Sequence, residues 1–251
     1  MTVAAPDWLT ARPIAHRGLH DRAAGRPENT LAAARAAVAG GFAIECDVQL
    51  SADGEAMVFH DAALGRLTGT GAALADRSAA ELGTLAVAGS AETIPTLPAF
   101  LAAVAGAVPV VIEVKSRYDG DLRLATRTAE IAAAYDGPVA LKSFDPQVVA
   151  ALRDLCPAAI PRGIVAETTQ DDPVYAALTP SLRRSLSDLL HLAETRPDFL
   201  SWRVDDLPCA PTYLCRLLGQ VPVMTWTVRN AEQRARAAAH ADQMVFEGFV
   251  P

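Results

Sequence analysis

Residues 43–60 read Ala-Ile-Glu-Cys-Asp-Val-Gln-Leu-Ser-Ala-Asp-Gly-Glu-Ala-Met-Val-Phe-His, and their spacing decides the predicted fold. Two strand-like runs, Ala43–Val48 and Ala56–His60, flank the Asp53-Gly54 pair, which is a strong turn signal in β-hairpins. The few residues between the runs cannot form a parallel crossover, which needs about a dozen. We therefore expect Ala56–His60 to pair antiparallel with the first run, as part of an insertion.

Strand-like runs alternate with Ala-rich helical stretches along the rest of the chain. Besides Ala43–Val48, these runs are Pro13–His16, Val108–Val114, Val139–Phe144, Arg162–Ala166, Phe199–Val204, Val221–Val228 and Gln243–Glu247. Such alternation is typical of βα units with a parallel sheet, and a chain of 251 residues has the length of one (β/α)8 barrel. The sequence predicts an α/β protein with a single TIM-barrel domain over residues 1–251. A small hairpin-containing insertion follows the second strand, at about residues 50–93.

Helix signals fill the spaces between these strands. The expected helices are Leu31–Ala39 (capped by Asn29 or Thr30), Leu97–Val104 (capped by Thr96), Asp121–Tyr135, Pro146–Leu155 and Arg234–His240 (preceded by Asn230). One long insertion, residues 168–195, reads as polar at first and then helical.

Composition and charge exclude several function classes. The net charge is −7, with 22 basic and 29 acidic residues and no basic tract, which argues against a nucleic-acid partner. No run approaches 18 apolar residues and no signal peptide is read at the start, so we expect no stable membrane insertion and a cytoplasmic location. The four cysteines lack CxxC spacing, which predicts free thiols. Composition leaves the oligomeric state open.

Charged residues recur inside the expected strands and at the ends of these strands. Glu45 and Asp47 are two residues apart, as are Glu113 and Lys115, so each pair faces one side of its strand. Cys46 then points to the opposite face, toward the helices. Three converging carboxylates repel one another unless a cation lies among them, and an all-oxygen set suits Mg²⁺ or Ca²⁺. The sequence predicts one divalent cation held by Glu45, Asp47 and Glu113.

Two cationic residues and two histidines complete this pattern. Arg17 and Lys115 supply positive charge that can bind a phosphate. An imidazole side chain ordinarily changes charge near neutral pH, so one of His16 and His60 suits the role of base and the other that of acid. Together with a metal, these groups predict phosphoryl-transfer chemistry. Phe144 and Trp226 lie near two strand ends, where an aromatic side chain is at least as often part of the core as a wall for a bound substrate.

A series of motifs carries a family resemblance. They are His16-Arg-Gly18, Pro27-Glu-Asn-Thr30, Glu45-x-Asp47, Asp53-Gly54, Val58-Phe-His-Asp61, Ile94-Pro-Thr-Leu97 and Glu113-x-Lys115. In the order and spacing of these motifs, roughly the first half of the chain resembles the glycerophosphodiester phosphodiesterases, and the second half matches more loosely. The resemblance implies a (β/α)8 barrel, the same three metal ligands, a histidine acid/base pair, and Arg17 and Lys115 at the phosphate.

The reaction implied by the resemblance is hydrolysis of a small glycerophosphodiester to sn-glycerol 3-phosphate and an alcohol, a step of lipid and glycerol metabolism. The family pattern suggests that the glycerol 2-hydroxyl attacks to give a cyclic phosphate, which water then opens. One position departs from the family, because the last strand ends at Glu247 where Thr-Asp is usual. Glu247 therefore has a longer arm than the usual acidic group.

Two alternatives stay open at this point. A lysophospholipase D or cyclic-phosphate-forming lyase would use the same barrel and would want an apolar rim, to which residues 168–195 could contribute. A non-catalytic phosphodiester-binding barrel would bind the same class of molecule without turnover. The presence of every expected ligand and of both histidines disfavours the binding barrel.

Overall fold

The computed structural model of the protein describes residues 5–171 and 173–251, and a central sheet dominates this part of the chain. Its strands are β1 (Ile14–Ala15), β2 (Ala43–Leu50), β3 (Ala56–Val58), β4 (Val110–Val114), β5 (Val139–Ser143), β6 (Arg162–Ala166), β7 (Phe199–Arg203), β8 (Val223–Val228) and β9 (Gln243–Phe246). The runs expected from the sequence all contain strands. The first is shorter than Pro13–His16, because Arg17 has a φ of 57° and turns the chain out of the sheet.

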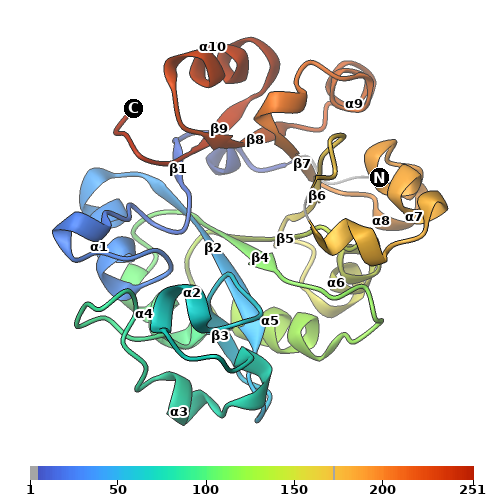
Figure 1. The fold of residues 1–251 in the computed structure, drawn as a ribbon. Coiled ribbons are helices and arrows are strands. Elements are labelled where there is room, and N and C mark those ends of the chain that lie inside the picture. Colours follow the sequence, from blue (N-terminus) through green and yellow to red (C-terminus); the bar gives the residue numbers. More distant parts are fainter. Residues whose placement is uncertain (1–4, 172) are drawn as a thin grey trace.

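The sheet closes on itself. β1 pairs in parallel with both β2 and β9, and β4 to β9 follow β2 in chain order, each parallel to its neighbour. β3 pairs antiparallel with β2 and lies outside the closed ring. Figure 1 shows the strands at the centre with helices around them. The predicted (β/α)8 barrel and the antiparallel hairpin are both confirmed.

Helices connect the strands on the outside of the barrel. They are α1 (Leu31–Gly40), α2 (Gly65–Thr68), α3 (Ala79–Leu82), α4 (Leu97–Val104), α5 (Arg123–Ala133), α6 (Pro146–Leu155), α7 (Pro180–Ser187), α8 (Leu192–Thr195), α9 (Ala210–Gly219) and α10 (Ala231–His240). Of the described helices, none combines the length and apolar character needed to cross a bilayer.

Local sequence explains where several helices begin and end. The Thr30 hydroxyl accepts a hydrogen bond from the Ala33 amide and starts α1, which stops at Gly41 with a φ of 71°. The helix expected at Asp121–Tyr135 begins later, because the Asp121 carboxylate accepts a bond from the Arg123 amide and stands before its first turn.

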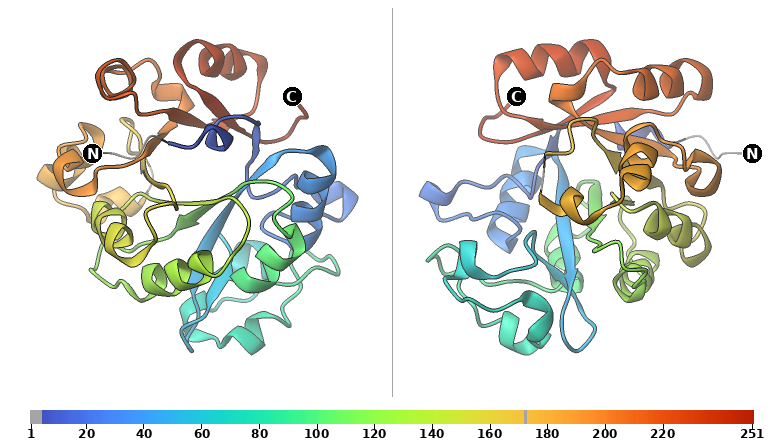
Figure 2. Two further views of the ribbon diagram at one scale, coloured as in Figure 1. Left: turned by 180° about the vertical axis from the view of Figure 1, so that it is seen from behind. Right: turned by 45° about the vertical axis from the view of Figure 1, so that its right-hand side comes forward.

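The insertion between β2 and β4 has its own apolar core. Val48 pairs with Val58 and Leu50 with Ala56, and both views of Figure 2 show this hairpin running past the barrel. This core consists of the buried side chains of Met57, Phe59, Leu64, Leu67, Leu74, Leu82, Val87 and Ile94. This core fixes the segment that carries His60 against the barrel.

A second apolar layer fills the space between the sheet and its helices. Cys46 is fully buried there with Ala34, Ala37 and Phe100, on the face of β2 opposite to Glu45 and Asp47. The expected outward direction of Cys46 is therefore confirmed. The four cysteines are unpaired.

Candidate active site

The interior of the barrel is arranged in two layers that follow from strand alternation. The lower layer is apolar and consists of Ile14, Ala43, Val111, Ala140, Phe199, Met224 and Val245, with Leu9 packed against it. Residues two positions further along face the same interior. They are His16, Glu45, Glu113, Lys142, Ser201, Trp226 and Glu247. An apolar plug thus closes one end of the barrel, and chemistry-bearing side chains stand above it toward the carboxyl ends of the strands.

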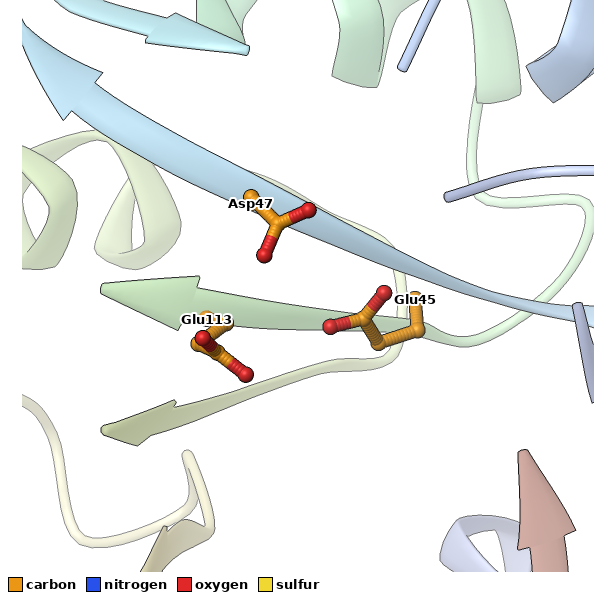
Figure 3. A group of neighbouring side chains, drawn as sticks. All are labelled: Glu45, Asp47 and Glu113. Carbon is orange, nitrogen blue, oxygen red and sulfur yellow. The ribbon is translucent and has the colours of Figure 1, made fainter. Parts of the chain in front are cut away.

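Three carboxylates lie close together toward this end of the barrel. Glu45 and Asp47 come from β2 and Glu113 from β4, where Asp47 and Glu113 are register partners. Each offers an oxygen, and these oxygens lie within 4.8 Å of one another. Figure 3 shows the three side chains converging on one space. They are 1%, 1% and 5% exposed. A compact, buried, all-oxygen donor set of this kind fits a hard divalent cation.

Two lysines contact the same carboxylates. Lys115 Nζ lies 2.7 Å from Asp47 Oδ1 and also contacts Glu113. Lys142 Nζ, from β5, lies 3.0 Å from Glu45 Oε1 and 3.2 Å from Glu113 Oε2. Burial by itself would raise the pKa of Glu113, but the two lysines outweigh burial and lower that pKa to about 2. Burial would lower the pKa of both lysines, and the carboxylates instead raise it.

Arg17 lies on the β1 side of the cluster. Its Nε is 3.3 Å from Asp47 Oδ2, its backbone amide donates to Glu45 Oε2 at 3.2 Å, and its Nη1 donates to Glu28 at 2.5 Å. Asn29, also at a φ of 57°, donates its amide to Asp47 Oδ2 at 2.9 Å and accepts from the Asp47 backbone at 3.2 Å. Asn29 thus fixes Asp47, while Thr30 takes the capping role that Asn29 could have had.

His16 and His60 are each held by a carboxylate. His16 Nδ1 lies 2.7 Å from Glu247 Oε2, and His60 Nδ1 lies 2.7 Å from Asp61 Oδ1. Because a carboxylate accepts, these contacts favour the proton on Nδ1 and leave Nε2 free for substrate chemistry. His16 Nε2 points toward the cluster, 4.0 Å from Glu45 Oε2. The hydrogen bond from His16 lowers the pKa of Glu247 to about 2, although burial opposes this shift.

Arg66 of α2 connects the insertion to the barrel. Its guanidinium binds Asp61 at 2.6 and 3.0 Å and Glu28 at 2.8 Å through each of two nitrogens. Glu28 in turn binds Arg17. His60 is therefore linked through Asp61, Arg66 and Glu28 to the side of the barrel that carries Arg17.

Phe144 and Trp226 form a separate aromatic pair. Their rings meet edge to face with centroids 5.5 Å apart, and both are half-buried. The Trp226 indole donates to the Ser201 carbonyl at 3.0 Å, which fixes its orientation over β7. The pair bridges from β8 to the end of β5, across the ring from β1 and β2.

The structure brings together Glu45, Asp47, Glu113, Arg17, Lys115 and His16, all expected from the sequence, and connects His60 to them through ion pairs. Sequence reasoning missed Lys142, Arg66 and the contact of Glu247 with His16. One signal for Lys142 was available, because it lies two residues from Ala140 and so had to share its interior face. Arg66 and Glu247 carried no local signal of their contacts.

Comparison with known proteins identifies the family. Residues 16–246 match the model of the glycerophosphoryl diester phosphodiesterase family. No curated protein matches the chain significantly.

Several solved structures have a similar fold. An Oleispira antarctica phosphodiesterase in complex with its product sn-glycerol-3-phosphate superposes with a TM-score of 0.75 at 23% identity, covering 95% of this chain and 94% of that one. A Thermotoga maritima glycerophosphodiester phosphodiesterase gives 0.70 at 23% identity, covering 93% and 92%. One from Parabacteroides distasonis gives 0.69 at 21% identity, covering 94% and 92%.

Proposed function

The chain belongs to the glycerophosphoryl diester phosphodiesterase family, and we propose that it hydrolyses glycerophosphodiesters to sn-glycerol 3-phosphate and an alcohol, with one divalent cation. The observation that carries this proposal is the buried cluster of Glu45, Asp47 and Glu113, whose oxygens lie within 4.8 Å of one another beside two cationic side chains. The product found in the similar Oleispira structure supports the same product class here.

Glu45, Asp47 and Glu113 are the proposed metal ligands, and Mg²⁺ or Ca²⁺ is the proposed ion. Such a cation, when bound, would neutralise phosphate charge and lower the pKa of the glycerol 2-hydroxyl. Asn29 holds the Asp47 carboxylate through its amide, so that ligand is already oriented before substrate arrives.

Arg17 and Lys115 are the proposed phosphate contacts. Both now bind the carboxylates, but their side chains are 16% and 19% exposed at the mouth of the barrel. With a cation bound to the carboxylates, the Arg17 guanidinium and the Lys115 ammonium would be available to bind phosphate oxygens. The substrate phosphodiester would then be held between these two side chains.

His16 and His60 are the proposed acid/base pair. One imidazole removes the proton from the 2-hydroxyl of glycerol as that oxygen attacks phosphorus, and the other gives a proton to the departing alcohol. Water opens the resulting cyclic phosphate. Glu247 and Asp61 support these roles, because each orients an imidazole and stabilises its protonated form.

Phe144 and Trp226 are the proposed contacts for the glycerol or alcohol part of the substrate. Their half-buried rings offer a rigid apolar surface at the open end of the barrel.

We further propose that residues 1–251 act as a single domain in the cytoplasm, supported by the four unpaired cysteines. Cell fractionation with thiol labelling tests the location.

Enzyme-coupled detection of glycerol 3-phosphate tests the activity. Glycerophosphodiesters of choline, ethanolamine, glycerol and inositol are incubated with the protein, with and without chelator. We expect glycerol 3-phosphate from at least one diester, and only when the cation is present. Accumulation of a cyclic phosphate alone would instead identify a lyase, and tight binding without any product would identify a binding barrel.

A further inference from the structure

Lys142 is a buried lysine in the active site to which the proposed reaction assigns no role. Lys142 is 2% exposed, and its ammonium contacts Glu45 and Glu113, two of the three proposed metal ligands. Lysine is almost never buried to this degree without anionic partners. Its position is set by the sheet, because Lys142 is the register partner of Glu113 and shares the interior face with Ala140.

The Lys142 ammonium contacts one oxygen of each glutamate, Oε1 of Glu45 and Oε2 of Glu113. The other Glu45 oxygen accepts from the backbone amide of Arg17, and the other Glu113 oxygen contacts Lys115 at the mouth. Each glutamate therefore has one oxygen tied to the buried Lys142 ammonium, while its other oxygen is held by a different group, the Arg17 amide for Glu45 and the partly exposed Lys115 for Glu113.

The net charge of the carboxylate cluster also indicates a role for Lys142. Three carboxylates carry a charge of −3, and a permanently buried ammonium reduces it to −2, which one divalent cation neutralises. Lys115 and Arg17 are partly exposed and can turn to the phosphate, whereas Lys142 is buried and forms its ion pairs in the described part of the chain with Glu45 and Glu113. A positive charge fixed this close to the ligands must also repel the metal.

We propose that Lys142 is a resident counter-ion of the carboxylate cluster, which fixes one oxygen of Glu45 and of Glu113 and weakens the binding of the divalent cation. This inference rests on the proposed metal site. It makes Lys142 a positioning residue, and it predicts a particular sign: removal of the charge tightens metal binding. A lysine that served only to support the structure would leave metal affinity unchanged or weaken it when removed.

Calorimetric titration of the metal-free protein with Mg²⁺ or Ca²⁺ tests the sign. Lys142→Met keeps the length of the side chain without its charge, and its Kd should fall by about tenfold or more. Its metal-free form should melt below the wild type, because Glu45 and Glu113 lose a buried partner. Saturating Mg²⁺ should then raise its Tm by more than it raises that of the wild type. Lys142→Arg, which keeps the charge, should bind no more tightly than the wild type.

Lys142→Gln guards against a variant that does not fold, because its amide can still donate to a glutamate, and it should also bind metal more tightly than the wild type. Unchanged or weaker affinity in both neutral variants would overturn the role of Lys142 while leaving the metal site in place. Absence of binding by the wild type as well would overturn the metal site itself, and the inference with it.

Discussion

Glu247 offers a sharp test of the acid/base proposal, because it is the carboxylate that binds the proposed catalytic residue His16. Its carboxylate lies 2.7 Å from His16 Nδ1, so Glu247→Gln removes the negative charge beside the imidazole and keeps the shape of the side chain. The amide oxygen of glutamine can still accept the Nδ1 proton. What is lost is the stabilisation of the imidazolium that forms when His16 carries an extra proton.

The size of this loss follows from the geometry. A hydrogen bond to a charged group has a net worth of about 1.5–3 kcal/mol, and about 1.4 kcal/mol corresponds to a tenfold change in rate. The His16 side chain is 10% exposed and that of Glu247 is 24% exposed, so solvent screens the pair only partly. We expect kcat to fall by about 10- to 100-fold, with KM nearly constant. His16→Ala should cost more, about 10²–10⁴-fold.

Steady-state release of glycerol 3-phosphate from one diester, at saturating metal, measures both constants. Arg229→Gln is the matched control, because Arg229 binds the same Glu247 oxygen at 3.1 Å from an exposed position. Such an exposed pair is worth little, so its loss should change kcat by less than about fivefold. A Glu247→Gln enzyme with wild-type kcat, or with a higher KM alone, would refute the stabilisation of the His16 imidazolium by Glu247.

Three further predictions concern the metal, the nucleophile and acid stability. EDTA should abolish activity, and Mg²⁺ or Ca²⁺ should restore it; full activity after exhaustive chelation would contradict the metal site. Calorimetry should show weaker metal binding in Glu45→Gln, Asp47→Asn and Glu113→Gln, and circular dichroism should show that each variant is still folded. A 2-O-methyl glycerophosphodiester should bind as a competitive inhibitor and release no alcohol, whereas rapid cleavage would mean that water attacks directly. Burial alone would raise the pKa of Glu28, but Arg66 and Arg17 lower it from 4.5 to about 2. Folding therefore favours the charged form of Glu28. The resulting stabilisation of the folded protein is present above pH 4.5 and is lost as pH falls toward 2. Urea denaturation of metal-free wild type and Glu28→Gln should therefore give a stability difference that shrinks over this range, and a difference independent of pH would contradict the Glu28 ion pairs.

The fold could be predicted from the sequence because its signals are local. The Asp53-Gly54 turn separated the antiparallel strand from the eight parallel ones, and the structure has this arrangement. Helices with good caps, such as α1 after Thr30, were also found. The short helices of the insertion were missed, since α3 has only four residues and cannot show a helical period. Helix α9 was missed because Leu217 and Leu218 are exposed, which obscures its buried face.

The active site likewise contains residues that could be predicted from the sequence and residues that could not. Glu45, Asp47 and Glu113 could be chosen because charged residues at alternate positions of a barrel strand must face its interior or its mouth. The partners of the histidines and lysines could not be found so directly. Glu247 lies 231 residues from His16, and Arg66 lies 38 residues from Glu28, so only the closed barrel brings these groups together.

Phosphorus-31 NMR of one reaction tests the central claim, which is metal-dependent hydrolysis at the carboxylate cluster. Chelator-treated protein is mixed with glycerophosphocholine, spectra are recorded, and Mg²⁺ or Ca²⁺ is then added. We predict that the diester signal is constant before the addition and is replaced afterwards by that of sn-glycerol 3-phosphate, and that Glu113→Gln gives no product in either phase. Formation of sn-glycerol 3-phosphate at full rate before the cation is added, or by Glu113→Gln as fast as by the wild type, would contradict it.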